Sequence, residues 1–354
     1  MILPRRFEKL LLTPADVSPS REDFEVVGVF NPGVVRAGGE VMMLVRVAER
    51  PREVRRGFTP LPRWDADAGL TVDWVADDDL RPIDPRVVER KADGLVRLTF
   101  TSHLQVVRLG DGRSVREATG ARFVPEGPME EFGVEDPRIT ELDGRYYFTY
   151  VSVSRHGACT SLASTVDFRS FERHGVIFCS ENKDVVLFPE RIGGAFAAIH
   201  RPNPATPFNR PEMWVASSPD LKHWGRHACL HGGGGEWETG RVGAGTPPVA
   251  VDDGWLEIYH GNRRPTRPGE VGAYSTGVLL LDRDDPSRVL RRAPGSIFEP
   301  TADFERRGFV PDVVFPTGIV DSPDGWLVYY GAADSSTAVV EFARDDVLGS
   351  LVDA

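Results

Sequence analysis

The chain has 354 residues, 41% of them hydrophobic and 27% charged, so it is long enough to bury a large core and too apolar to be disordered. Its 53 acidic residues outnumber its 42 lysines and arginines, and the resulting net charge of -11 at pH 7 argues against nucleic acids and anionic membranes as partners, because such a field repels polyanions. A small anion can still bind in a local pocket of cations, since distant charges are screened beyond about 10 Å.

Neither the start of the chain nor its cysteines indicate export. The first residues contain no apolar run long enough for a signal peptide, and no segment approaches the roughly 20 apolar residues that span a bilayer. The three cysteines, Cys159, Cys179 and Cys229, are odd in number and lack a Cys-x-x-Cys spacing, which argues against a disulfide framework or a zinc site. We therefore expect a cytoplasmic protein.

Five segments repeat one pattern along the chain: a proline near the start, an apolar strand, a turn that contains glycine, and a second apolar strand. They are residues 32–47, 137–152, 189–202, 248–261 and 316–331. The turn dipeptides Gly-Gly and Asp-Gly adopt positive φ readily, so each segment predicts a β-hairpin.

A shorter element recurs between the hairpins, at residues 165–171 and 218–224. Each copy contains an aspartate that caps a turn and ends in an aromatic residue, which is typical of the outer edge of a sheet. Five hairpins with outer strands give about four strands per unit, so we predict an all-β fold, a single five-bladed β-propeller over residues 1–354. Residues 50–97 are too many for one connection, and we expect an insertion or arm there.

The innermost strands of a propeller converge on its axis, so polar residues at the ends of the five hairpins should face one small volume. The candidates are Asn31, Arg46, Glu135, Asp136, Arg138, Lys183, Asp184, His200, Arg201, Arg241, His260 and Asp334.

The tetrapeptide Glu135-Asp136-Pro137-Arg138 places two carboxylates and a guanidinium at the start of an otherwise apolar strand. A carboxylic acid in this position could protonate a leaving oxygen. Alternatively, Asp136 caps the turn and pairs with Arg138, as carboxylates before proline often do. The motif by itself leaves both interpretations open.

Three cations, Lys183, Arg201 and Arg241, stand at the ends of neighbouring hairpins. Their convergence in an acidic protein requires an anion that offsets their mutual repulsion, either a phosphate or buried carboxylates.

Several strings, in order from Phe30 to Asp334, jointly resemble glycoside hydrolase family 130. They are FNPG (30–33), GVEDPR (133–138), NKD (182–184) with LFPE (187–190), HRP (200–202), RVGAG (241–245) with PP (247–248), WLEIYHG (255–261) and YYGAAD (329–334). The resemblance implies a five-bladed propeller that cleaves β-mannosides with inversion, by phosphorolysis in most members and by hydrolysis in a minority.

The resemblance also implies roles for individual residues. Asp136 would be the general acid, whose proton can reach the glycosidic oxygen through a sugar hydroxyl. Phosphate would be bound by Lys183, Arg201 and Arg241, with Tyr274 as a further contact. Around the sugar we expect Asn31, Arg46, His103, Glu135, His200, His260 and Asp334.

A phosphorylase binds phosphate where an inverting hydrolase needs a carboxylate base and a water. The three cations favour phosphorolysis that yields α-mannose 1-phosphate. An inverting β-mannosidase, acting for instance on β-1,2 linkages, would draw its base from Glu212, Glu238 or Glu257, although a glutamate in such a strand is more often solvated or ion-paired. A non-catalytic carbohydrate-binding propeller would keep the hairpins but would need no acid beside three cations.

We expect a β-mannoside oligosaccharide and inorganic phosphate as substrates, with no other cofactor. We expect no metal site either, because His223, His227 and His231 adjoin a glycine-rich run that does not form a helical ligand face. The loops 51–63 and 203–211 should determine the linkage, and a homo-oligomer is a further expectation.

Overall fold

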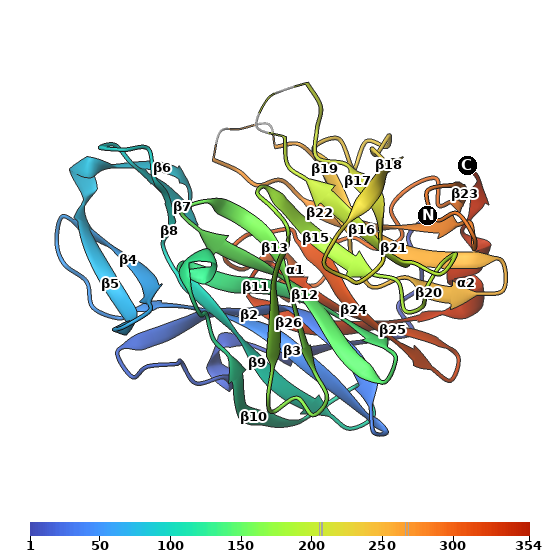
Figure 1. Cartoon of the computed structure of the whole chain (residues 1–354), viewed down its shortest axis with the longest axis horizontal. Helices are drawn as coiled ribbons and strands as arrows, with labels where there is room; N and C mark the ends of the chain where they lie inside the picture. Colours follow the sequence, from blue (N-terminus) through green and yellow to red (C-terminus); the bar gives the residue numbers. More distant parts are fainter. Residues whose placement is uncertain (205, 207, 266, 268) are drawn as a thin grey trace.

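The computed structural model describes residues 1–204, 206, 208–265, 267 and 269–354. Five antiparallel sheets form a ring, and two smaller sheets project from it (Figure 1). This arrangement confirms the predicted all-β, five-bladed propeller. The described residues contain no helix long and apolar enough to cross a membrane.

The blades follow one another along the chain. Blade 1 comprises β2 (Phe24–Ala37), β3 (Glu40–Pro51), β9 (Thr101–Leu109) and β10 (Val115–Phe123). Blade 2 comprises β11 (Gly133–Leu142), β12 (Arg145–Ser154), β13 (Gly157–Thr165) and β14 (Glu172–Phe178). Blade 3 comprises β15 (Asn182–Leu187), β16 (Phe196–Pro202), β17 (Met213–Ser218) and β18 (Gly225–His231).

The last two blades depart slightly from this pattern. Blade 4 comprises β19 (Arg241–Ala244), β20 (Val249–Val251), β21 (Gly254–Asn262), β22 (Tyr274–Leu281), β23 (Val289–Arg292) and β27 (Val352–Asp353). Blade 5 comprises β24 (Val314–Ser322), β25 (Gly325–Ala332), β26 (Ser336–Ala343) and β1 (Phe7–Leu12). Short helices connect some strands: η1 (Pro14–Asp16), η2 (Asp77–Asp79), η3 (Pro128–Glu130), α1 (Asp303–Arg306) and α2 (Arg344–Gly349).

The predicted hairpins form the inner strands of the blades. Four of them pair as expected, at β2–β3, β11–β12, β20–β21 and β24–β25. The hairpin predicted at residues 189–202 was wrong in its first strand. The inner strand β15 ends at Leu187, before Pro189, and only a small bridge between Ile192 and Ala195 surrounds the Gly-Gly turn. The chain thus needs a longer connection before β16.

Strand β3 is apolar on both faces because a neighbouring blade covers each face. Along β3, Val41, Met43 and Val45 pack toward blade 5, whereas the alternate residues Met42 and Leu44 pack toward blade 2. This alternation follows from the two-residue period of a strand. It explains why the hairpins are nearly continuous apolar runs in the sequence.

Strand β1 closes the ring by pairing with β26, so the beginning of the chain forms the outer edge of the last blade. Arg5 supports this closure because its guanidinium lies 2.9 Å from the carboxylate of Glu305, which is fully buried. The closure covers an outer strand that would otherwise be an exposed edge.

The recurrent aspartate turns connect the third and fourth strands of blades 2 and 3. Asp167 accepts hydrogen bonds from the backbone N–H groups of Arg169 and Ser170, and Asp220 accepts the equivalent bonds in the next blade. Both predicted turns are therefore confirmed, and in each the aspartate side chain satisfies backbone donors of the turn.

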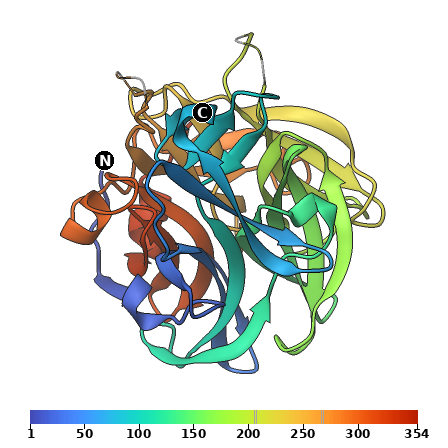
Figure 2. The same cartoon turned by 90° about the vertical axis from the view of Figure 1, so that its left-hand side faces the viewer.

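Between β3 and β9 the chain leaves the ring and forms a projecting segment, here called the arm (residues 58–98). Figure 1 shows it at one end of the molecule, and Figure 2 views the molecule from that end. Its strands are β4 (Phe58–Asp65), β5 (Gly69–Ala76), β6 (Leu80–Asp84), β7 (Val87–Arg90) and β8 (Val96–Leu98). The arm returns toward the ring at the β6–β7 turn, which brings residues of that turn to the cavity described next.

Candidate active site

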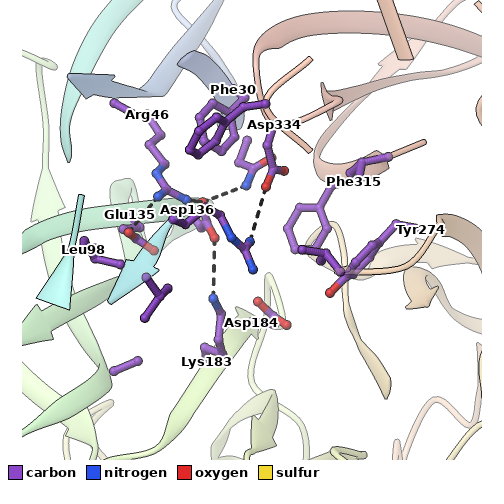
Figure 3. Close-up of a pocket in the computed structure, with 18 of the residues that line it drawn as sticks. Phe30, Arg46, Leu98, Glu135, Asp136, Lys183, Asp184, Tyr274, Phe315 and Asp334 are labelled. Carbon is purple, nitrogen blue, oxygen red and sulfur yellow. Dashed lines mark hydrogen bonds and ion pairs between the residues drawn. The ribbon is translucent and has the colours of Figure 1, made fainter. Parts of the chain in front are cut away.

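A cavity of about 330 Å³ lies where inner strands of the blades and the arm meet (Figure 3). Its lining includes most of the predicted site residues: Asn31, Arg46, Glu135, Asp136, Lys183, Arg201, Arg241, Tyr274 and Asp334. They come from all five blades, so the ring gathers polar groups that lie up to three hundred residues apart in the sequence.

Three of the cavity residues occupy equivalent positions in successive blades. Asn31, Asp136 and Asp184 have φ angles of 51°, 49° and 55°, and each lies where the register of its inner strand shifts. Such a bulge rotates one side chain out of the strand alternation, and Asn and Asp tolerate positive φ better than most residues. The repeated bulge therefore turns a polar side chain of each of these three blades into the cavity.

Asp136 is buried between several donors. Its Oδ1 accepts hydrogen bonds from Asn31 Nδ2 at 2.8 Å and from Arg46 Nη1 at 2.9 Å, and its Oδ2 lies 4.0 Å from Lys183 Nζ. Burial by itself would raise the pKa of Asp136, but Arg46, Lys183 and Arg138 hold it below its usual value. The carboxylate is therefore ionised when the cavity contains no other anion.

Arg46 fixes the two carboxylates of the Glu135-Asp136 pair relative to each other. While Nη1 binds Asp136, Nη2 lies 2.7 Å from Glu135 Oε1, and the guanidinium stacks 4.6 Å from the ring centre of Phe30. Figure 3 shows this group on one side of the cavity and the rings of Tyr274 and Phe315 on the other. Because one guanidinium binds both carboxylates at once, this wall of the cavity is rigid.

The part of the cavity lined by blades 3 and 4 is rich in positive charge, because it carries Lys183, Arg201 and Arg241. Burial lowers the pKa of Arg201, and repulsion from the nearby Arg241 lowers it further, while Asp184 opposes both effects. Arg201 nevertheless remains protonated, as arginine does in proteins. Its Nε is buried and has no hydrogen-bond partner among the described residues, so an anion in the cavity could accept a bond there.

Tyr274 lines the same cavity and stands on β22, in the blade that carries Arg241. Lys183 stands between this positive group and Asp136. The cavity thus has a cationic half beside a buried carboxylate, which suits an anion that reacts close to an acid.

A buried layer supports the cationic half. Asp184 Oδ2 lies 2.9 Å from Arg201 Nη1 and 3.3 Å from His260 Nε2, and Asp184 Oδ1 lies 3.7 Å from Arg138 Nη2. Burial lowers the pKa of His260 to about 4, so the imidazole is neutral and can donate to Asp184. Arg138 also donates to the backbone oxygens of Asp136 and Gly245, which ties blade 2 to blade 4 across the axis.

Asp184 was a candidate by position but received no role from the sequence. The signal was available, because the residue after Lys183 occupies the same place in its blade as Asp136 does in the preceding one. Arg86 from the arm also lines the cavity, 3.5 Å from Asp334, and no sequence signal pointed to it.

The other predicted residues lie outside the cavity lining. His103 is fully buried beside Glu49, at 3.3 Å. His200 stacks on Phe178 and contacts His227 at 3.0 Å, and burial lowers its pKa to about 3. His260 belongs to the layer behind Asp184.

The three alternative bases are likewise absent from the cavity lining. Glu212 is half-buried and accepts a bond from Asn209 at 2.6 Å. Glu238 accepts bonds from Tyr259 and the Gly235 N–H. Glu257 is fully buried, and burial raises its pKa well above the usual value.

The loops expected to determine linkage contribute unequally. Within 51–63 no residue lines the cavity, whereas Asn203 from the second loop does, as far as the described residues extend. Residues 205 and 207 of that loop lie outside the described residues.

Known proteins resemble this chain over most or part of its length. A family model described as β-1,4-mannooligosaccharide phosphorylase matches residues 97–352. The β-1,2-mannobiose phosphorylase of Listeria innocua serovar 6a is 38% identical over 357 residues, which covers 99% of each chain. The 1,2-β-oligomannan phosphorylase of Thermoanaerobacter sp. (strain X514) is 37% identical over 226 residues, covering 63% of this chain and 72% of that protein.

A solved structure gives the same result. The β-1,2-mannobiose phosphorylase from Listeria innocua, in complex with β-1,2-mannobiose, matches with a TM-score of 0.89 at 38% identity, and the match covers 96% of each chain.

Proposed function

The chain belongs to glycoside hydrolase family 130, and from that premise and the geometry of the cavity we propose that it is an inverting β-mannoside phosphorylase that releases α-mannose 1-phosphate. The single observation that carries this conclusion is the juxtaposition of buried Asp136 with a cationic half-cavity whose Arg201 Nε lacks a partner among the described residues.

In the proposed reaction, phosphate lies against Lys183, Arg201 and Arg241. One phosphate oxygen forms a bond to the anomeric carbon while the bond from that carbon to the glycosidic oxygen breaks. The electron pair passes to the glycosidic oxygen, which takes a proton from Asp136, directly or through a sugar hydroxyl. Attack from the face opposite the leaving group inverts the β-mannoside to an α-phosphate.

The charges of the cavity suggest how Asp136 acquires its proton. Without phosphate, Arg46 and Lys183 favour the ionised carboxylate. A bound phosphate dianion would offset the charge of Lys183 and add a negative charge nearby, and both effects raise the pKa of Asp136. Phosphate binding would therefore favour the protonated acid that the leaving group needs.

The hydrolytic alternative has weaker support. An inverting hydrolase needs a free carboxylate base across the sugar from the acid. Glu212, Glu238 and Glu257 are not in the cavity lining, and the cavity carboxylates Glu135, Asp184 and Asp334 are each paired with an arginine. Glu181 is exposed at the rim, where its Oε2 accepts a long bond from Asn203.

For the substrate we propose a β-1,2-linked mannoside, with β-1,2-mannobiose as the first choice. The support is the similarity to a β-1,2-mannobiose phosphorylase over nearly the full length of the chain. We give this similarity more weight than the description of the family model, which names β-1,4-linked mannooligosaccharides. Asn31, Arg46, Glu135 and Asp334 would hold the mannosyl unit, since they supply paired polar groups around the cavity.

The test is a phosphate-dependence assay. The purified protein is incubated with β-1,2-mannobiose or β-1,4-mannobiose, with and without inorganic phosphate, and the products are followed by proton and phosphorus NMR. We expect α-mannose 1-phosphate from the β-1,2 disaccharide only when phosphate is present. Equal release of free mannose in phosphate-free buffer would establish hydrolysis instead.

A further inference from the structure

The geometry points to Arg86, carried by the arm, as a positioning residue of the active site that holds the Asp334 carboxylate as a hydrogen-bond acceptor for the sugar. The inference rests on the proposed function. It makes the arm a working part of the mannoside site, although the other residues proposed to hold the mannosyl unit come from the propeller blades.

Arg86 is held in place by its own turn. It lies between β6 and β7, where Asp84 accepts hydrogen bonds from the Arg86 backbone N–H at 2.7 Å, from Nη2 at 3.1 Å and from Nε at 3.3 Å. This clamp leaves Nη1 directed at Asp334, with 3.5 Å between Nη1 and Oδ2. Because Asp84 already holds the Arg86 guanidinium, the side chain loses little conformational entropy when it pairs with Asp334.

Other arginines of the arm do not share this placement. Arg81, on the neighbouring strand, pairs with Glu89, and its side chain is 66% exposed compared with 29% for Arg86. Arg86 lines the cavity, together with Val87 and Leu98 of the arm, whereas Arg81 does not. Arg81 is therefore a matched control for the charge and location of Arg86.

Asp334 requires a nearby cation. It follows β25 with a φ of 48°, and only 16% of its side chain is exposed. Burial, the largest effect, and the charge of Asp136 leave the pKa of Asp334 above its usual value, although Arg86, Arg46 and Lys183 lower it, with Arg86 the strongest of these three. Arg46 is already engaged by Glu135 and Asp136, and Lys183 faces Asp136.

The ionisation of Asp334 matters for sugar binding. An ionised carboxylate accepts hydrogen bonds from two sugar hydroxyls, whereas a protonated one offers a donor in place of one acceptor site. Without Arg86, the pKa of Asp334 would rise, so mannoside binding would be lost at a higher pH as the solution is acidified. Phosphate binding should be affected less, because Arg86 is paired with the carboxylates of Asp84 and Asp334 and leaves little free positive charge for phosphate.

The experiment compares Arg86→Ala, Arg86→Lys and Arg81→Ala with the wild type. Steady-state phosphorolysis of β-1,2-mannobiose is measured from pH 4.5 to 8, and folding is checked by thermal unfolding. For Arg86→Ala we expect the KM for mannobiose to rise about tenfold or more, as for loss of a charged hydrogen bond, with the KM for phosphate changed less than about twofold. We also expect the acidic limb of kcat/KM for mannobiose to move to higher pH.

The other two variants separate charge from structure. Arg86→Lys keeps the positive charge but cannot form the bidentate contact with Asp84, so its KM for mannobiose should rise while its acidic limb stays near that of the wild type. Arg81→Ala should match the wild type in both respects. An Arg86→Ala variant with unchanged KM and acidic limb would overturn the inference, as would an Arg86→Lys limb that moves as far as that of Arg86→Ala.

The proposed function fails separately. If the wild type forms no mannose 1-phosphate from any mannoside, the proposed reaction is refuted. If the wild type is active and the Arg86 variants behave as the Arg81 control does, only the role of Arg86 is refuted.

Discussion

Replacing Asp136 with asparagine isolates proton donation from binding. The amide oxygen of asparagine can still accept the bonds from Asn31 Nδ2 and Arg46 Nη1, at 2.8 Å and 2.9 Å in the wild type. Only the charge and the transferable proton are lost, and the position that changes to NH₂ is the one that faces Lys183 at 4.0 Å. The variant should therefore fold and bind mannoside.

The expected loss in kcat follows from the role of a general acid. Such catalysis contributes about 10²- to 10⁴-fold, so the barrier should rise by about 3 to 5 kcal/mol. The assay is phosphorolysis of β-1,2-mannobiose at saturating phosphate, with the KM for mannobiose expected within about threefold of the wild type. Thermal unfolding of both proteins controls for misfolding.

An activated substrate gives the decisive comparison. An aryl β-mannoside with a strongly acidic phenol as leaving group needs little protonation, so Asp136→Asn should lose less than about tenfold on it. A variant that retains its full rate on mannobiose would refute the acid role. Equal losses on both substrates would refute it too, because a distorted or electrostatically altered cavity would then explain the defect.

Three further predictions concern the surroundings of this acid. Arg241→Gln should raise the KM for phosphate about tenfold to a hundredfold, as expected for a lost charged hydrogen bond, with the KM for mannoside nearly unchanged; an unaltered phosphate KM would exclude Arg241 from the phosphate site. Asp184→Asn removes the buried partner of Arg201, so unfolding should show a loss of about 3 kcal/mol or more, and the phosphate KM should also rise; wild-type values of both would contradict the supporting role of Asp184. Arg5→Met leaves buried Glu305 without its cation and should lower the free energy of unfolding, measured by chemical denaturation, by about 3 kcal/mol. The Arg6 side chain is 60% exposed, so Arg6→Met should cost less than about 1 kcal/mol. Equal losses would contradict the closure role of Arg5.

Strand alternation explains why only one of two adjacent predicted residues lies in the cavity. Arg201 lines the cavity, but His200, the preceding residue on β16, points to the opposite face and stacks on Phe178. Both were predicted to face the site because both end the same hairpin. Successive residues of a strand point to opposite faces, so one register step separates a cavity residue from a core residue.

His103 was misleading for another reason. It stands on β9, the third strand of blade 1 from the axis, and pairs with buried Glu49. A histidine in a polar motif carries no information about which strand of a blade it will occupy. The distance from the axis depends on the order of pairing in the sheet.

The sequence alone determined the five-fold repeat, the Asp turns of the outer strands, and the positions of Asp136, Lys183, Arg201 and Arg241 at the ends of hairpins. These features depend on turn chemistry and apolar patterning within short segments, which are written locally in the chain. Only the tertiary structure decided that Asp184 and His260 support the cations from behind and that Arg86 enters the cavity from the arm. Those contacts join strands of different blades or a distant insertion, and their geometry is fixed by how the blades pack around the axis, which no local pattern encodes.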